Sequence, residues 1–308
     1  MRSLFAPLLV VAIVAPSAPA QAWSRPGHMV AAAIAYDELM RDDPAVVAEM
    51  LRLLAAHPDP GPFQVAIDRA EGAERDRRRF LEMARWPDDV RGGAQDHPTW
   101  HYRMRAVTQG GAGVKDAAAK GSGVEALALN LSVARDPRAP AADRAVALCW
   151  ILHVVADLHQ PLHSAERVSP DWPSGDEGGS KVFVRDQVTG QPVSLHWYWD
   201  DAVSRDGSAS AAFTRAHELT ARFPRTQFAA ALSQAVAAPD ASGRWLAESH
   251  ELAVSLAYRA DAPLARSAAT ALPATPAYAA AVTSTAEQRV TLAGYRLADL
   301  LRTVFADR

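Results

Sequence analysis

Residues 148–163 read LCWILHVVADLHQPLH, an apolar run that holds a histidine and an acid one helical turn apart. In an α-helix, His153 and Asp157 project from the same face because residues four apart are neighbours on the surface. Pro161 ends this helix, and His163 follows just past the break. Neither lysine nor arginine lies within one turn of Asp157. Because a buried carboxylate needs a cation, a metal ion here is the simplest prediction.

Residues of the same types occur at a few other places in the chain. Any single buried histidine is more often a satisfied core residue than a ligand. The recurrence of histidine and aspartate among apolar neighbours favours a metal site, since zinc prefers histidine nitrogen and carboxylate oxygen. One His-x3-Asp pair alone would also fit the histidine–aspartate phosphohydrolases. The further candidates are His196 and Asp200 in SLHWYWDD, Asp88 in RWPDDVR, His101 in WHYR and His28 in WSRPGH.

Most of the remaining chain has the apolar periodicity of helices. Short β-branched segments at 181–185 and 191–195 predict a hairpin around residues 188–190. The pattern therefore indicates an all-α fold, a single helical domain with one small β-hairpin. Glycine-rich stretches at 92–93, 110–113, 121–123 and 169–180 predict loops. Helical spacing occurs at 28–40, 46–55, 65–84, 144–158, 211–222, 228–236, 244–260 and 277–305.

The first 22 residues form a separate segment with the pattern of a secretory signal peptide. One arginine precedes a short apolar run, and Ala20-Gln21-Ala22 matches a cleavage site. We therefore expect residues 1–22 to be removed, 23–308 to form the catalytic domain, and the protein to be secreted or periplasmic. Cleavage would make Trp23 the first residue.

Charge and cysteine content exclude several classes. The net charge of −3 gives no basic field that could hold duplex DNA by counterion release alone. A single cysteine, Cys149, excludes an internal disulfide and a cysteine-rich zinc module. The histidines are therefore the ligands of interest.

Taken in order, these motifs resemble a known family. The chain is similar to the zinc-dependent single-strand nucleases of fungi and their plant bifunctional and bacterial relatives. It is more distantly similar to bacterial zinc phospholipase C. The matching segments are Trp23-Ser-Arg-Pro-Gly-His28, Trp86-Pro-Asp88, Trp100-His-Tyr102, His153-x3-Asp157-Leu-His-Gln-Pro-Leu-His163, Gly175-Asp-x-Gly-Gly179 and Leu195-His196-x3-Asp200.

The resemblance implies a site with three Zn²⁺ ions. Asp157 would bridge the first two ions. The α-amino nitrogen and carbonyl oxygen of Trp23 would serve as ligands once the chain is cleaved. The implied ligands are Asp88, His101, His153 and Asp157 for one ion, Trp23, His28 and Asp157 for the second, and His163, His196 and Asp200 for the third.

The resemblance also implies an activity. The enzyme would cleave single-stranded DNA and RNA with metal-activated water, give 5′-phosphorylated products and act on 3′-nucleotides. Asp88 would orient the water, Arg91 would clamp the phosphate, and Tyr102 would stack on a base. Met104 stands where fungal members carry an acid, and Ser180 replaces the usual asparagine after the glycine pair, so base preference is left open. We expect a monomer without stable membrane association.

Two alternatives remain open at this point. A phospholipase C would use the same metal centre on a lipid headgroup. A non-catalytic zinc-binding protein would need the ligands but no open site. The aromatic side chain of Tyr102 favours the nuclease, because stacking recognises unpaired bases without regard to sequence.

Overall fold

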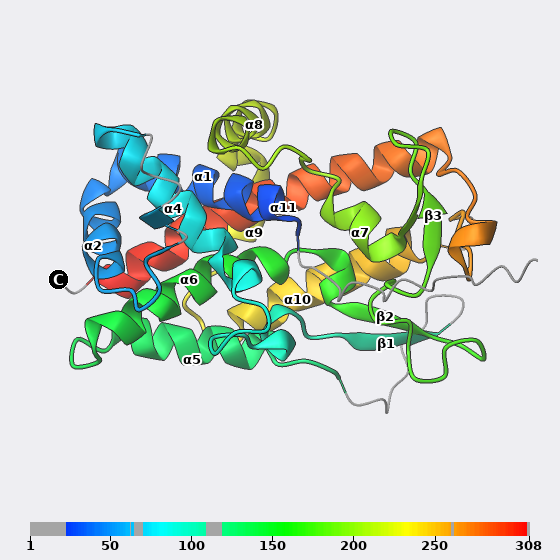
Figure 1. Ribbon diagram of the computed structural model, residues 1–308, viewed down its shortest axis with the longest axis horizontal. Coiled ribbons are helices and arrows are strands. Elements are labelled where there is room, and N and C mark those ends of the chain that lie inside the picture. The colour runs from blue at the N-terminus through cyan, green and yellow to red at the C-terminus, as the bar shows by residue number, and fades with distance from the viewer. Residues whose placement is uncertain (1–22, 62, 65–69, 109–118, 260–261, 307–308) are drawn as a thin grey trace, which may run out of the picture.

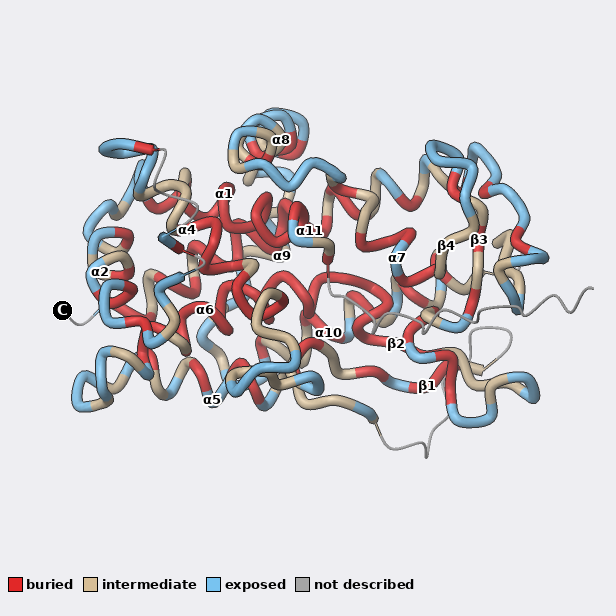
Figure 2. Tube along the Cα trace, in the orientation of Figure 1, coloured by how far each residue is buried: buried red, intermediate tan, exposed pale blue. Residues whose placement is uncertain are grey.

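Helix α6 (Ala141–Asp157) runs through the middle of the molecule, and residues 147–157 are all buried. The computed structural model describes residues 23–306 except 62, 65–69, 109–118 and 260–261 (Figure 1). In Figure 2 the tube of α6 is red along most of its length, whereas α8 (Ala209–Arg222) lies at the edge with exposed residues on its outer side. A helix that is apolar on all sides needs neighbours on all sides. The surrounding helices meet that need and carry most of the fold.

Two long helices, α1 and α11, pack against each other at the centre. Helix α1 (Arg25–Asp42) is buried on nearly every face of its first half, and α11 (Pro276–Phe305) is the longest helix. A Cβ at Gly294 of α11 would lie 2.6 Å from Cβ of Ile34 on α1. Glycine therefore allows the two helices to approach closely, and α1 also contacts α6.

The other helices cover this centre. Helices α2 (Pro44–Leu54) and α4 (Gly72–Asp89) lie at one end, and α5 (Gly123–Arg135) packs along α6. Helix α10 (Ala241–Leu252) continues as a π-helical turn, Ala253–Ala257, and α9 (Ala229–Leu232) is a single turn. The short helix α7 (Leu195–Asp200) follows the hairpin, and brief 3₁₀ turns occur at Pro98–His101, Pro161–His163, Arg225–Phe228 and Ala268–Thr270.

Strands are few and short. Strands β3 (Phe183–Arg185) and β4 (Pro192–Ser194) form the predicted antiparallel hairpin. Strands β1 (Arg105–Thr108) and β2 (Ala165–Val168) form a second, parallel pair that the sequence pattern did not indicate. The all-α prediction with a small hairpin is confirmed.

The expected helices are mostly present, with three differences. Residues 65–69 of the helix expected at 65–84 lie outside the described residues, and α4 begins at Gly72. The helix expected at 228–236 is only a 3₁₀ turn and the single turn α9. Helix α5 was not predicted, and the loop expected at 121–123 ends where it begins. The loop expected at 110–113 lies outside the described residues.

Candidate metal centre

Helix α6 presents two of the predicted ligands from one buried face. His153 and Asp157 are each 0 % exposed, and His153 Nε2 lies 3.3 Å from Asp157 Oδ2. The helix ends at Asp157, and the 3₁₀ turn Pro161–His163 then brings His163 to the same side. His163 Nδ1 lies 3.7 Å from Asp157 Oδ1. The motif HxxxDxxxxxH therefore folds back so that its three ligand-type side chains converge.

Asp157 lies between histidines from three segments of the chain. Its Oδ1 is 3.3 Å from Nε2 of His28 on α1, and its Oδ2 is 3.4 Å from Nδ1 of His101. His101 Nδ1 is also 2.9 Å from His153 Nε2, and the rings of His28 and His153 stack with centroids 3.7 Å apart. The two carboxylate oxygens thus face different histidines, as a bridging ligand requires.

Three groups of side chains place their ligand atoms close enough to hold a metal ion. Within each group, the atoms lie within 4.8 Å of one another, and all the residues are buried. Asp88 joins at the end of α4, with its Oδ1 3.8 Å from His153 Nε2. In the third group, His196 Nε2 lies 3.4 Å from Asp200 Oδ2 on α7. The groups are His28, His153 and Asp157; Asp88, His101 and His153; and His163, His196 and Asp200.

Backbone carbonyls hold three of the imidazoles in place. The Nδ1 atom faces a carbonyl in each case, which leaves Nε2 as the nitrogen that points into the site. Such an outer hydrogen bond is the usual partner of a metal-binding histidine because it fixes the tautomer and the ring orientation. The pairs are His153 with Ala84 at 2.8 Å, His163 with His101 at 2.6 Å, and His196 with Gly178 at 2.7 Å.

Gln160 connects α7, which carries Asp200, with the 3₁₀ turn that carries His163. The sequence analysis gave this residue no role. The side chain is fully buried, and its Nε2 donates to Asp200 Oδ1 at 2.6 Å. Its Oε1 accepts from the backbone N–H of Leu162, at the start of the 3₁₀ turn. The residue follows the ligand Asp157 by three positions, so the only sequence signal for it was its place inside the motif.

Burial determines the protonation of these groups in the metal-free protein. Burial, followed by the nearby carboxylates of Asp88 and Asp200, raises the pKa of Asp157 well above its usual range. Burial also raises the pKa of Asp200, and it lowers the pKa of His28 and His101 well below the usual value. Neutral imidazoles are ready to bind a metal, whereas the buried acids need a cation to ionise.

The donor set fits a metal ion on independent structural grounds. Both oxygens of Asp157 and both ring nitrogens of His28 are buried and have no hydrogen-bond partner among the residues that the structure describes. The same holds there for Oδ2 of Asp88 and Oδ2 of Asp200. Because buried polar atoms are almost always satisfied, such a cluster needs a ligand. Nitrogen and carboxylate oxygen are the donors that zinc prefers.

Trp23 lies beside this cluster. Its side chain is 0 % exposed, and its indole Nε1 donates to the carbonyl of Ala156 at 2.9 Å. The next residue, Ser24, donates through its backbone N–H to the carbonyl of Asp200 at 3.3 Å. The start of the described chain is therefore attached to Asp200 itself and to Ala156, the neighbour of Asp157.

A pocket of about 240 Å³ opens over the cluster. Arg91, which follows α4, contributes to its wall and donates to Asp88 Oδ1 from Nη2 at 2.7 Å and from Nε at 3.2 Å. Tyr102 also lines it, half-buried, with the aromatic ring that the sequence analysis singled out. The pocket is lined by Arg91, Pro98, His101, Tyr102, Met104, His163, Glu177 and His196, of which Glu177 and Pro98 were not anticipated.

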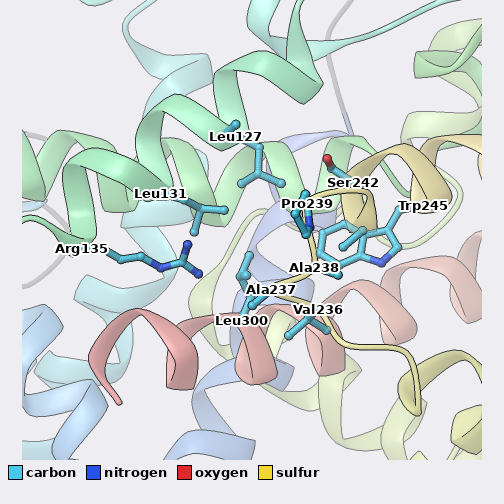
Figure 3. A pocket seen from close by; sticks show the side chains of 12 residues that line it. Leu127, Leu131, Arg135, Val236, Ala237, Ala238, Pro239, Ser242, Trp245 and Leu300 are labelled. Carbon is cyan, nitrogen blue, oxygen red and sulfur yellow. The ribbon is translucent and has the colours of Figure 1, made fainter. Parts of the chain in front are cut away.

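A second pocket of about 260 Å³ lies elsewhere, between α5, α10 and α11. Figure 3 shows Leu127, Leu131 and Trp245 around it, with Arg135 at one side. It contains none of the histidines or acids of the three groups, so the chemistry belongs to the pocket beside His163 and His196.

Comparison with known proteins agrees with the geometry. The model of the S1/P1 nuclease family matches residues 23–306. A comparison with individually curated proteins gives no match. Along the described chain, none of the helices has both the length and the apolar character that crossing a membrane requires.

Proposed function

Because this chain belongs to the S1/P1 nuclease family, we propose that it is a secreted phosphodiesterase with three zinc ions that hydrolyses single-stranded DNA and RNA. Its products would carry 5′-phosphates, and it would also remove the phosphate of 3′-nucleotides. The observation that carries this proposal is the convergence of three buried histidine and aspartate groups beside an open pocket.

The ligand assignment follows the contacts around Asp157. Its Oδ1 faces His28 and its Oδ2 faces His101 and His153, which supports a bridge between two ions. The assigned ligands are Asp88, His101, His153 and Asp157 for the first ion, His28, Asp157 and the amino-terminal Trp23 for the second, and His163, His196 and Asp200 for the third.

When bound, zinc ions lower the pKa of a water molecule to about 7 and offset the charge of a phosphodiester. Asp88 has one oxygen near His153 and the other without a hydrogen-bond partner in the described chain, so its carboxylate can orient the attacking water by accepting a hydrogen bond from it. Arg91 can donate to the anionic oxygens of the phosphate, because guanidinium presents several N–H donors in one plane. Tyr102 supplies a flat face for an unpaired base.

In this proposal, removal of residues 1–22 completes the second zinc site. A free α-amine has a pKa of about 7.7–8.0, so a useful fraction is neutral and able to bind metal. The amine of Trp23 exists only after removal of residues 1–22, which have the pattern of a signal peptide. The family match begins at Trp23, the residue that this cleavage would expose. The signal-peptide pattern is what supports a periplasmic or extracellular location. We propose a monomer.

The test is hydrolysis of a labelled single-stranded oligonucleotide by protein that begins at Trp23. We expect cleavage that stops when EDTA is added, returns with Zn²⁺, and is much slower on the matched duplex. The fragments should carry 5′-phosphates. Release of a phosphorylated headgroup from phosphatidylcholine, without any cleavage of DNA, would instead identify a phospholipase C. Zinc binding without hydrolysis of either substrate would identify a non-catalytic zinc protein.

A further inference from the structure

Glu177 occupies an unusual position in the active-site pocket. It lies in the loop between β2 and β3 and lines the same pocket as Tyr102 and the ligand-type histidines His163 and His196. It is the only acid in that lining, and its backbone φ is +55°, the only positive value for a non-glycine residue among those that the structure describes. A left-handed backbone is unfavourable for a residue with a side chain, which points to a role at the site.

The loop that carries Glu177 is firmly held. The preceding residue, Asp176, is buried, and its Oδ1 accepts from the backbone N–H groups of Arg167 at 2.9 Å and Gly179 at 3.1 Å. The hydroxyl of Tyr258 donates to the same oxygen at 2.9 Å. These contacts fix the backbone on one side of Glu177.

Gly178, the residue after Glu177, is hydrogen-bonded to a side chain of the candidate metal centre. The carbonyl of Gly178 accepts from Nδ1 of His196 at 2.7 Å. A Cβ at Gly178 would lie 2.6 Å from the carbonyl oxygen of Leu162, so this backbone has little room to shift. Glu177 is thus attached at a defined place beside a ligand of the third ion.

An acid at this place is unfavourable for a substrate that is only an anion. The carboxylate of Glu177 repels phosphate, and its ion pair with Nζ of Lys181 at 2.8 Å offsets that charge in part. A carboxylate becomes favourable here if the substrate also brings hydrogen-bond donors.

We propose that Glu177 makes the pocket selective for guanine, an inference that rests on the proposed nuclease function. The base would lie against Tyr102 and Met104, and the two carboxylate oxygens would accept from N1–H and N2–H of its Watson–Crick edge. Guanine alone presents two adjacent donors there. Adenine and cytosine pair one donor with an acceptor, and uracil places one donor between two carbonyls, so each would leave an oxygen of Glu177 facing another acceptor.

The experiment compares four ribonucleoside 3′-monophosphates by kcat/KM, and it measures binding of 5′-GMP and 5′-AMP by calorimetry. We expect the guanine nucleotide to be favoured about 5- to 100-fold, as a bidentate base contact provides. Glu177→Gln should shift the preference toward adenine and cytosine, whose edges each pair a donor with an acceptor as an amide does. Glu177→Gly should abolish the preference without lowering Tm, because glycine tolerates this φ. Lys181→Met is the control, and it should keep the guanine preference.

The outcomes separate this inference from the proposed function. Hydrolysis with no base preference, or with an unchanged preference in Glu177→Gly, would overturn the role of Glu177 while the nuclease stands. Absence of hydrolysis with 5′-GMP binding that depends on Glu177 would overturn the nuclease and support the guanine site. Absence of both hydrolysis and selective binding would overturn both.

Discussion

Asp157 lies close to four histidines of the candidate site, namely His28, His101, His153 and His163. It lies 3.3 Å from the Nε2 atoms of His28 and His153 and 3.4 Å from Nδ1 of His101. Without a cation, burial of this carboxylate beside Asp88 and Asp200 is unfavourable, and its pKa rises accordingly. In the proposed site, this one residue would connect the occupancy of two metal positions.

Replacement of Asp157 should remove two metal ions at once. We expect the zinc content of Asp157→Ala to fall from three ions per chain to one. The activity should fall at least about 100-fold, which is the upper end of the loss that replacing a supporting residue around a metal site causes. Elemental analysis of the purified protein gives the stoichiometry. Asp186→Ala, at an equally buried acid that pairs with Arg205, is the control and should keep three ions. Three ions in Asp157→Ala would exclude the bridge.

Gln160 should act on the third ion alone. Its amide holds Asp200 through a 2.6 Å hydrogen bond, so Gln160→Leu would free this ligand to rotate. The affinity for one zinc should fall about 10- to 100-fold, as for other supporting residues of metal sites. Competition with a zinc-binding dye measures this affinity.

The control for Gln160 is a second glutamine that bonds a backbone group. Gln187 donates to the carbonyl of Ala274, away from the metal-site residues, so Gln187→Leu should lose a hydrogen bond but no zinc. Equal zinc affinities in Gln160→Leu and the unaltered protein would show that Asp200 is held by other contacts.

At the scale of elements, the sequence predicted α6, the hairpin and most helices because their apolar residues repeat locally. Helix α5 was missed because its pattern misleads. Asn130 is buried, with its side chain bonded to the carbonyl of Ala126, whereas Leu129 is 53 % exposed. The parallel pair β1–β2 was missed because it joins Arg105 to Ala165, far apart in the sequence and without a hairpin turn.

The candidate site was more predictable than the fold around it, because ligand-type residues stand out in an apolar sequence. The three groups contain His28, Asp88 and the other histidines and acids expected from the motifs. Glu177 and Gln160 were missed as functional residues. Their roles depend on a backbone angle and on a contact with Asp200, and neither feature has a sequence pattern.

The turn between β2 and β3 offers a test at the element scale. In Gly178→Ala, the new Cβ would meet the carbonyl of Leu162 at 2.6 Å and Nδ1 of His196 at 3.2 Å, at a φ of +61°. We expect the protein to lose about 1–2 kcal/mol from the backbone angle alone, which lowers Tm by several degrees, and to lose zinc from the third group as well.

Gly190 provides a matched control for that variant. Its φ is +69°, yet a Cβ there would have nothing within 4 Å. Gly190→Ala should therefore lower Tm by a similar backbone contribution and keep all its zinc. If both variants retain the same zinc content, the carbonyl of Gly178 does not orient His196.

At the scale of the whole molecule, the beginning of the described chain is part of the interior. Trp23 is fully buried against Ala156, and α1 packs along α11. Five parts of the chain meet at the candidate metal centre, namely α1, α4, the 3₁₀ turn Pro98–His101, α6 with the turn after it, and α7. Metal binding would therefore connect them in the way that a disulfide does elsewhere, in a protein whose one cysteine, Cys149, is buried and free.

Blocking the new amino terminus should weaken the site. A variant with one added alanine before Trp23 converts the α-amine to an amide, which cannot bind zinc through nitrogen. We expect it to lose one zinc ion per chain and at least about 10-fold in activity, measured beside a control with alanine added after Arg308. Full zinc content and activity in the extended protein would show that Trp23 is not a ligand.

The central claim is that the three histidine and aspartate groups are zinc sites. The most direct measurement is anomalous X-ray diffraction at the zinc edge from crystals of the protein that begins at Trp23. We expect three anomalous peaks, each about 2.0–2.2 Å from the nitrogen and oxygen atoms of its group, with Asp157 between two of them. A map with no zinc peak at these residues would contradict the claim.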